Sequence, residues 1–203
     1  MKNIFYIGLL FLAVSCGKLS PKGDIEVKDI ELSEFTKLDA KGKFRLFYVQ
    51  GPHNFVSVET TPNFIENLDI KVIDGILSIN EKRETQGLGL YNLTIYGKNN
   101  FNDIKMSDSV EMNISSQMTV KDFRLTLKDQ AKFIGSVVSD KIWIDMAQKS
   151  KANLLGKSDL AYIQIADTAS IISPYWFVQN LEIVSKNQNY TEVNVEKELS
   201  GSI

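Results

Sequence analysis

The stretch KDFRLTLKDQAKFIGSVVSD, residues 121–140, has a plan that recurs through the second half of this chain of 203 residues. An apolar pair two residues apart, Leu125 and Leu127, is followed by a polar triplet and then by a second alternating segment. The same plan is found in NDIKMSDSVEMNI, WIDMAQKSKANLL, YIQIADTASIIS and NLEIVSKNQNYTEVNV. The second members of the apolar pairs step by 21, 19, 19 and 18 residues through Met106, Leu127, Met146, Ile165 and Ile183.

This repeat predicts an all-β fold. Alternation with a period of two residues is typical of strands, and a unit of about nineteen residues is too short for repeats built from helical hairpins. At roughly 3.3 Å per residue such a unit has a perimeter of about 60 Å, enough for three short strands around an apolar interior. We therefore expect a single-stranded parallel β-helix of about 19–21 residues per coil, wound in the right-handed sense that parallel crossovers favour.

The polar triplets SDS, KDQ, AQK, ADT and SKN are expected at the corners of the coils, where short polar side chains bond locally. Two of them also resemble an acceptor for O-glycosylation in the envelope of some Gram-negative bacteria: an aspartate, then serine or threonine, then an apolar residue. Ser109 and Thr168 are the candidate sites. Matches of three residues arise easily by chance, so a turn role alone is the favoured interpretation.

The first half of the chain is less regular. FTKLDAKGKFRLFYV and FVSVETTP read as strands joined by a tight turn at Gly51-Pro52, and Asp74-Gly75 between two apolar runs favours a two-residue hairpin turn. EKRETQGLG is expected to be a loop. Because an open solenoid end exposes unpaired backbone and apolar interior, these strands are predicted to form an irregular antiparallel cap at the amino-terminal end.

The amino terminus has the form of a signal peptide. Lys2 precedes an apolar run, Ile4 to Val14, that is short for a bilayer span. AVSCGK then resembles the lipobox of bacterial lipoproteins, and it contains the only cysteine of the chain, Cys16. We expect residues 1–15 to be removed, Cys16 to be acylated, residues 16–23 to form a polar tether and residues 24–203 to form one domain. The alternative is an ordinary secretory peptide with an incidental cysteine.

Three segments together resemble one known family: SEFTKLDAKGKFRLFYVQG, NLDIKVIDGILSIN and VEKELSGSI. The family is the bacterial domain called the putative auto-transporter adhesin, head GIN domain, and the resemblance extends from about Phe35 to the end. Its members usually have Ser-Gly-Ser-like corners, whereas this chain keeps only Ser200-Gly201-Ser202. The resemblance implies a β-helix-like fold and an extracytoplasmic envelope lipoprotein, and it carries over no catalytic residue.

The composition argues against several kinds of chemistry. A formal charge of −2 without a Lys/Arg stripe speaks against nucleic-acid binding. The only histidine, His53, lies in a predicted turn, and no Cys/His cluster suggests a metal or cofactor. Three acidic residues, Asp103, Asp145 and Glu182, are expected in one outward column, where we interpret them as a solvated face rather than the carboxylate cluster of a polysaccharide lyase. The protein is therefore predicted not to be an enzyme.

One outward column is more informative. Residues three positions before the second apolar member should face solvent, and they read Asp103, Arg124, Trp143, Tyr162 and Asn180. With adjacent coils about 4.8 Å apart, Arg124, Trp143 and Tyr162 would form a ladder able to contact sugars or a partner protein. The alternative is that another segment covers this column. The other aromatic group, Pro174 to Phe177, is expected to be mainly buried.

These observations predict a binding or adhesin-like lipoprotein of the cell envelope, anchored by lipid to the outer membrane and facing either the periplasm or the outside. The expected partners are the membrane and a glycan or envelope protein, with no cofactor. Two alternatives remain: a polysaccharide lyase or hydrolase on the same scaffold, and a purely structural envelope component. The sequence leaves the oligomeric state open.

Overall fold

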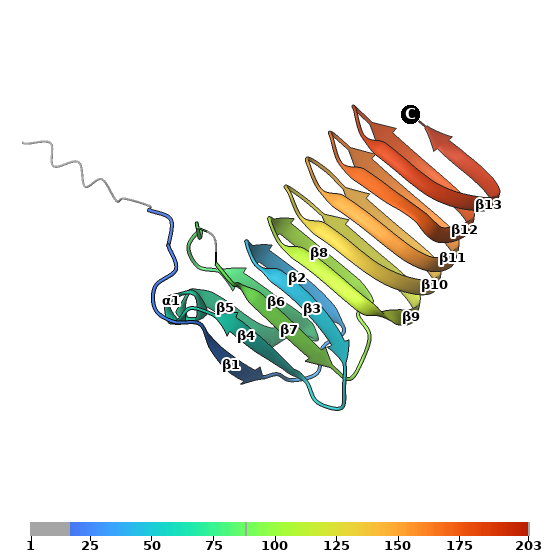
Figure 1. Ribbon diagram of the computed structural model, residues 1–203. Coiled ribbons are helices and arrows are strands. Elements are labelled where there is room, and N and C mark those ends of the chain that lie inside the picture. Colours follow the sequence, from blue (N-terminus) through green and yellow to red (C-terminus); the bar gives the residue numbers. More distant parts are fainter. Residues whose placement is uncertain (1–16, 88, 203) are drawn as a thin grey trace, which may run out of the picture.

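The computed structural model describes residues 17–87 and 89–202, so Cys16 lies outside the described residues. Five long strands pair in parallel and are stacked one after another along the solenoid axis, each forming most of one coil (Figure 1). They are β9 (Glu111–Leu127), β10 (Lys132–Met146), β11 (Lys151–Ala166), β12 (Ser170–Lys186) and β13 (Tyr190–Ser202). Lys132 pairs with Glu111 in one direction and with Lys151 in the other, offsets of 21 and 19 residues. The predicted parallel β-helix and its period are confirmed.

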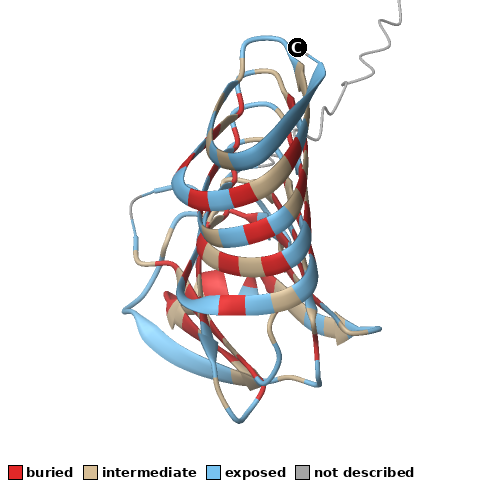
Figure 2. Ribbon diagram, turned by 90° about the vertical axis from the view of Figure 1, so that its right-hand side faces the viewer, coloured by how far each residue is buried: buried red, intermediate tan, exposed pale blue. Residues whose placement is uncertain are grey.

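The coils formed by β9 to β12 bury alternate residues along much of their length, and Figure 2 shows these as red bands between pale blue and tan ones. In β10 the inward series begins with Phe133 and ends with Ser139. The next two residues, Asp140 and Lys141, are both exposed, which shifts the alternation by one position before Ile142 turns inward again. That shift marks a corner of the coil.

The polar triplets form a continuous row of corners along the solenoid. The middle residue of the first four triplets and the last residue of the fifth have a left-handed backbone, with φ between 58° and 70°, at Asp108, Asp129, Gln148, Asp167 and Asn187. Aspartate and asparagine tolerate this conformation better than most residues. The expected corner role is confirmed.

Hydrogen bonds connect these corners from one coil to the next. The N–H of Asp108 donates to Oδ2 of Asp129 (3.0 Å), and the N–H of Asp129 donates to Oε1 of Gln148 (2.6 Å). The N–H of Gln148 then donates to Oδ2 of Asp167 (3.0 Å), and the side-chain amide of Asn187 donates to Oδ1 of the same carboxylate (3.1 Å). The sequence predicted that the corner side chains bond within their own turn. Instead they bond to the neighbouring coil, because the coils stack in register and each side chain lies next to the preceding corner. We call this row the corner ladder.

Antiparallel pairing occurs at the amino-terminal end, as predicted. β1 (Glu26–Glu31) pairs with β4 (Phe55–Thr60), and β5 (Leu68–Ile73) pairs with β6 (Ile76–Glu81). The β5–β6 hairpin turns at Asp74 and Gly75, whose φ values of 50° and 73° suit the predicted two-residue turn. A short helix that the sequence reading missed, α1 (Pro62–Glu66), follows β4 and begins with proline.

The cap is nevertheless a mixed sheet rather than a purely antiparallel one. β2 (Lys37–Gly42) pairs in parallel with β6 and with β8 (Asp103–Asp108), while β3 (Arg45–Gln50) pairs in parallel with β9. The strands predicted on either side of Gly51-Pro52 form as β3 and β4, but they do not pair with each other, because β7 (Asn92–Gly97) lies between them and pairs with both. This insertion buries Leu93 and Ile95 of β7 in the common core.

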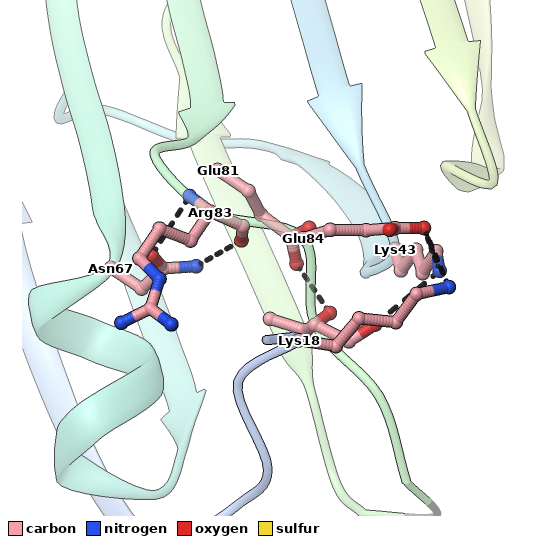
Figure 3. A network of polar contacts seen from close by, with 7 residues as sticks. Lys18, Lys43, Asn67, Glu81, Arg83 and Glu84 are labelled. Atoms are coloured by element: carbon pink, nitrogen blue, oxygen red, sulfur yellow. Dashed lines mark hydrogen bonds and ion pairs between the residues drawn. The ribbon is translucent and has the colours of Figure 1, made fainter. Parts of the chain in front are cut away.

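Residues 17–22 lie against the cap and do not form a free tether; we call them the amino-terminal strap (Figure 3). Arg83 donates to the carbonyl of Gly17 through Nη2 (2.7 Å). Leu19 forms a parallel bridge with Thr85, in which its N–H donates to the carbonyl of Glu84 (2.8 Å). The expected spacer is thus folded onto the domain from residue 17 onward.

Side chains secure the same segment. The Glu84 carboxylate pairs with Lys43 (2.6 Å) and Lys18 (3.1 Å), joining the strap to the loop before β3. The amide of Asn63 donates to the carbonyl of Ser20 (2.8 Å), and its oxygen accepts from the N–H of Lys22 (2.9 Å). Within residues 17–87 and 89–202, no helix is both long and apolar enough to span a bilayer.

The corner ladder predicts a specific loss of stability. Asp129→Ala removes the acceptor for the N–H of Asp108 and places alanine at a φ of 58°. We expect the free energy of unfolding in urea to fall by about 1–2 kcal/mol. Asp129→Asn keeps an acceptor and tolerates the backbone, so it should remain close to wild type. Lys128→Ala at the same turn is the matched control, and an equal loss in all three variants would contradict the ladder.

The strap predicts a pH-dependent contribution. Hydrogen bonds from Lys43 and Lys18 lower the pKa of Glu84 below its usual value. A lowered pKa means that the pairing stabilises the folded state above about pH 4.3, the unfolded pKa, and that this stabilisation is lost as the pH falls through the folded pKa. The difference in Tm between wild type and Glu84→Gln should therefore shrink on acidification. Glu31→Gln on β1 is the control, and a difference independent of pH would contradict this assignment.

Candidate functional site

The predicted aromatic ladder forms on adjacent coils. Trp143 pairs with Arg124 on one side and with Tyr162 on the other. The rings of Trp143 and Tyr162 stack with centroids 5.9 Å apart and planes 13° apart, and the guanidinium carbon of Arg124 lies 5.5 Å from the indole centroid. The structure thus brings the three residues together, while their role in binding stays a prediction.

This stacking limits what the ladder can contact. One face of the Trp143 ring lies against Tyr162 and the other lies under the Arg124 guanidinium. A sugar ring that packs flat on an aromatic side chain needs a free face. Trp143 therefore presents only its ring edge, beside the Arg124 cation and a small hollow of about 180 Å³, whose other lining residues include Thr126, Asp145 and Gln164.

Two details of this column differ from the prediction. Tyr162 pairs with Glu182 and not with Asn180, because one extra residue at the corner of β12 lengthens the offset between the two strands from 19 to 20 residues, whereas the predicted step was 18. Asp145 pairs with Thr126 and Gln164, so it belongs to the neighbouring column and not to that of Asp103. The three acidic residues are therefore not gathered, and the described part of the chain holds no group of three or more potential metal-ligating side chains.

The second aromatic group, Pro174 to Phe177 in β12, has side chains both in the interior and on the surface. Trp176 is fully buried, and its indole N–H donates to the hydroxyl of Ser158 (3.2 Å). Tyr175 and Phe177 are 69% and 40% exposed. The expected burial is correct for Trp176 and wrong for its two neighbours, because adjacent residues of a strand point to opposite faces and Pro174-Tyr175 bulge at the corner.

Tyr175 and Phe177 border a groove of about 480 Å³ at this corner of the solenoid, which we call the corner groove. Its polar lining comes from four coils: Gln117, Lys157, Asp159, Gln179 and Glu196. The Gln179 amide donates to Asp159 (3.0 Å) and accepts from Lys197 (2.6 Å), which fixes its orientation.

Glycine is required beneath this groove. Gly156 lines it with a φ of 104°, and a Cβ at this position would lie 2.3 Å from the carbonyl oxygen of Val137.

The interruption of a regular repeat by proline and three aromatic residues is the sequence signal that could have identified the groove.

The candidate O-glycosylation sites both lie in the corner row. Ser109 is half-buried, and its N–H donates to the carbonyl of Gly42 (2.9 Å). Thr168 is exposed, and its hydroxyl donates to the carbonyl of Gln148 (2.9 Å). Their modification stays a prediction. Cys16, the predicted lipidation site, lies outside the described residues.

A third, charged hollow of about 650 Å³ lies beside the strap and is lined by Lys18, Lys41, Lys43, Glu81, Glu84 and corner residues. Burial raises the pKa of Glu81, while its hydrogen bond from Thr85 (2.9 Å) acts in the opposite direction. Burial also raises the pKa of the Tyr91 phenol, and the nearby Glu81 raises it further. Glu84 in this hollow is already paired with two lysines, so we assign the hollow to the attachment of the strap.

The fold is similar to that of several solved bacterial proteins. A putative adhesin from Bacteroides fragilis matches with a TM-score of 0.75 at 13% identity, over 91% of this chain and 97% of its own. A putative lipid binding protein from Parabacteroides distasonis matches with a TM-score of 0.67 at 14% identity, over 92% and 100%. A putative adhesin from Parabacteroides merdae matches with a TM-score of 0.61 at 12% identity, over 92% and 99%.

At these identities the similarity shows the fold alone, and no curated protein matches the sequence. The family profile described as "Putative auto-transporter adhesin, head GIN domain" matches residues 34–203. That range includes the whole solenoid, the corner groove and nearly all of the cap, and it agrees with the resemblance inferred from the sequence. The chain therefore belongs to the putative auto-transporter adhesin, head GIN domain family.

Proposed function

We propose that this protein is a lipid-anchored, adhesin-like lipoprotein of the bacterial envelope that binds carbohydrate in the corner groove. The observation that carries the proposal is the exposure of Tyr175 and Phe177 beside polar side chains contributed by four coils. The adhesin-like part is supported by the family and by the names of the similar structures. The proposal includes no catalytic step.

The chemistry of the groove suits a sugar chain. Exposed aromatic side chains stack on the C–H faces of sugar rings, and Tyr175 and Phe177 do not stack on each other as the ladder residues do. Lys157 can donate to hydroxyls, Asp159 can accept from them, and Gln179 can do both. Because these groups lie on successive coils, an extended glycan would run along the solenoid axis.

The aromatic ladder of Arg124, Trp143 and Tyr162 is the second candidate for carbohydrate binding. Arg124 lies over Trp143 and borders the hollow that also contains Asp145 and Gln164. A guanidinium held in this way can pair with the carboxylate or sulfate of an acidic sugar. We place the ladder second because both faces of Trp143 are already covered.

Membrane attachment is the other part of the proposal. The lipobox-like sequence ends at Cys16, and the strap begins at the next residue. An acylated Cys16 would therefore hold the cap close to the outer membrane, with the later coils farther from the surface. Two or more acyl chains would make this attachment stable.

The carbohydrate proposal is tested by a glycan array with soluble protein that starts at residue 17 and keeps the strap. We expect Tyr175→Ala/Phe177→Ala to weaken binding at least tenfold, because stacking is worth more than about 1.4 kcal/mol. Trp143→Ala/Tyr162→Ala is the matched variant and should stay within about twofold of wild type. Loss only in the ladder variant would move the site to the ladder, and no binding by folded wild type would contradict a glycan role.

The anchor is tested by labelling cells with a radioactive fatty acid. We expect wild type to be labelled and found in the membrane fraction, whereas Cys16→Ala should be unlabelled and soluble, because the acylated thiol is absent. Ser15→Ala keeps a small residue before the cleaved bond and serves as the control. Release of an unlabelled wild-type protein would instead establish an ordinary secretory peptide.

A further inference from the structure

Among the described residues, one edge of β13 is not covered by another strand. β13 is the final strand in the order of the sheet and pairs with β12 on one side. No other strand in the described residues pairs with its second side. Such an edge presents unpaired N–H and C=O groups that can accept one more strand. At the opposite end, the cap strands and α1 occupy the corresponding place (Figure 1).

The interior of the solenoid is also open at this edge. A hollow of about 340 Å³ is lined mainly by apolar side chains, and its lining consists of Leu181, Ile183, Ser185, Asn189, Thr191, Val193, Val195 and Leu199. Val193 and Val195 are only half-buried, and Leu199 is 64% exposed. The Thr191 hydroxyl is enclosed without a hydrogen-bond partner among the described residues. An added strand with alternating apolar residues would cover this surface as each coil covers the one before it.

The charge along the edge indicates which strand fits. The exposed residues of β13 include three glutamates, Glu192, Glu196 and Glu198. The one lysine among them, Lys197, donates to Gln179 (2.6 Å). A second copy of this strand would bring like charges together, whereas lysine or arginine on the incoming strand would face carboxylates.

We propose that the free edge of β13 is a strand-addition site for an extended segment of another protein in which apolar residues alternate with lysine or arginine. Backbone hydrogen bonds to the edge would supply affinity, and the apolar side chains would enter the hollow between Val193 and Leu199. The glutamates give selectivity, because they attract a basic strand and oppose pairing between identical copies. This site is separate from the stacking residues of the corner groove, so neither proposal depends on the other.

The experiment measures fluorescence anisotropy of a labelled Lys-Val peptide of eight residues on the protein starting at residue 17. We expect binding that weakens with salt, and at least tenfold weaker binding of the Glu-Val counterpart. Glu192→Lys/Glu198→Lys should reverse this preference. It leaves out Glu196, which lines the corner groove. Glu26→Lys/Glu31→Lys on β1 is the matched control and should leave the preference unchanged.

Two N-methylated versions of the Lys-Val peptide test whether it binds through backbone hydrogen bonds or through charge attraction alone. One carries methyl groups on alternate amides and the other carries them on the remaining amides. Only one edge of an added strand bonds to β13, so one peptide should bind and the other should not. Equal binding of both, or an unchanged preference in Glu192→Lys/Glu198→Lys, would overturn the proposal. So would a dimer of the protein that dissociates when β13 is altered, because the edge would then belong to a second copy.

Failure of this proposal can be told apart from failure of carbohydrate binding. Tyr175→Ala/Phe177→Ala should keep full affinity for the Lys-Val peptide, because neither side chain lines the hollow at β13. Loss of peptide binding in that variant would place the peptide in the corner groove and overturn strand addition.

Discussion

The hydrogen bonds of the corner ladder set the register on which the rest of the structure depends. Three successive left-handed corner residues, Asp108, Asp129 and Gln148, each donate their N–H to the corner side chain one coil further on, and the last acceptor is Asp167. Parallel strands could slide past one another by two residues and still keep apolar side chains inside. The corner bonds prevent such a slip, because each side-chain oxygen of the corner ladder accepts from the N–H of one particular corner residue. Columns of aligned side chains are the result.

The proposed binding surface arises where the coils depart from this regularity. Between the aligned corners, β12 accommodates one extra residue at Pro174-Tyr175, and the pairing with β11 resumes with a shifted register. The bulge turns Tyr175 and Phe177 outward while Trp176 fills the interior against Ser158. A rigid repeat thus supplies the frame, and one local insertion supplies the concave, aromatic surface.

Much of the solenoid could be predicted because local alternation and a fixed period determine which residues meet. The pairing of Arg124, Trp143 and Tyr162 follows directly from that period. The sequence predicted Asn180 beside Tyr162 in this column, but Glu182 lies there instead. This could not be predicted, because the register of β12 depends on the bulge at its corner. The position of β7 between β3 and β4 and the docking of Leu19 on Thr85 join residues distant in sequence, for which no local pattern exists.

The strap would have a mechanical consequence if the protein is anchored at Cys16 as proposed and also bound to a partner. Tension applied at Cys16 would act first on the bonds of Gly17, Leu19 and Ser20, which lie one after another along the chain and break singly. Adjacent coils are joined instead by whole strands whose bonds share the load. The strap would therefore peel away first and lengthen the connection by roughly 20 Å at about 3.3 Å per residue. It would act as an extensible element that protects the folded coils from force.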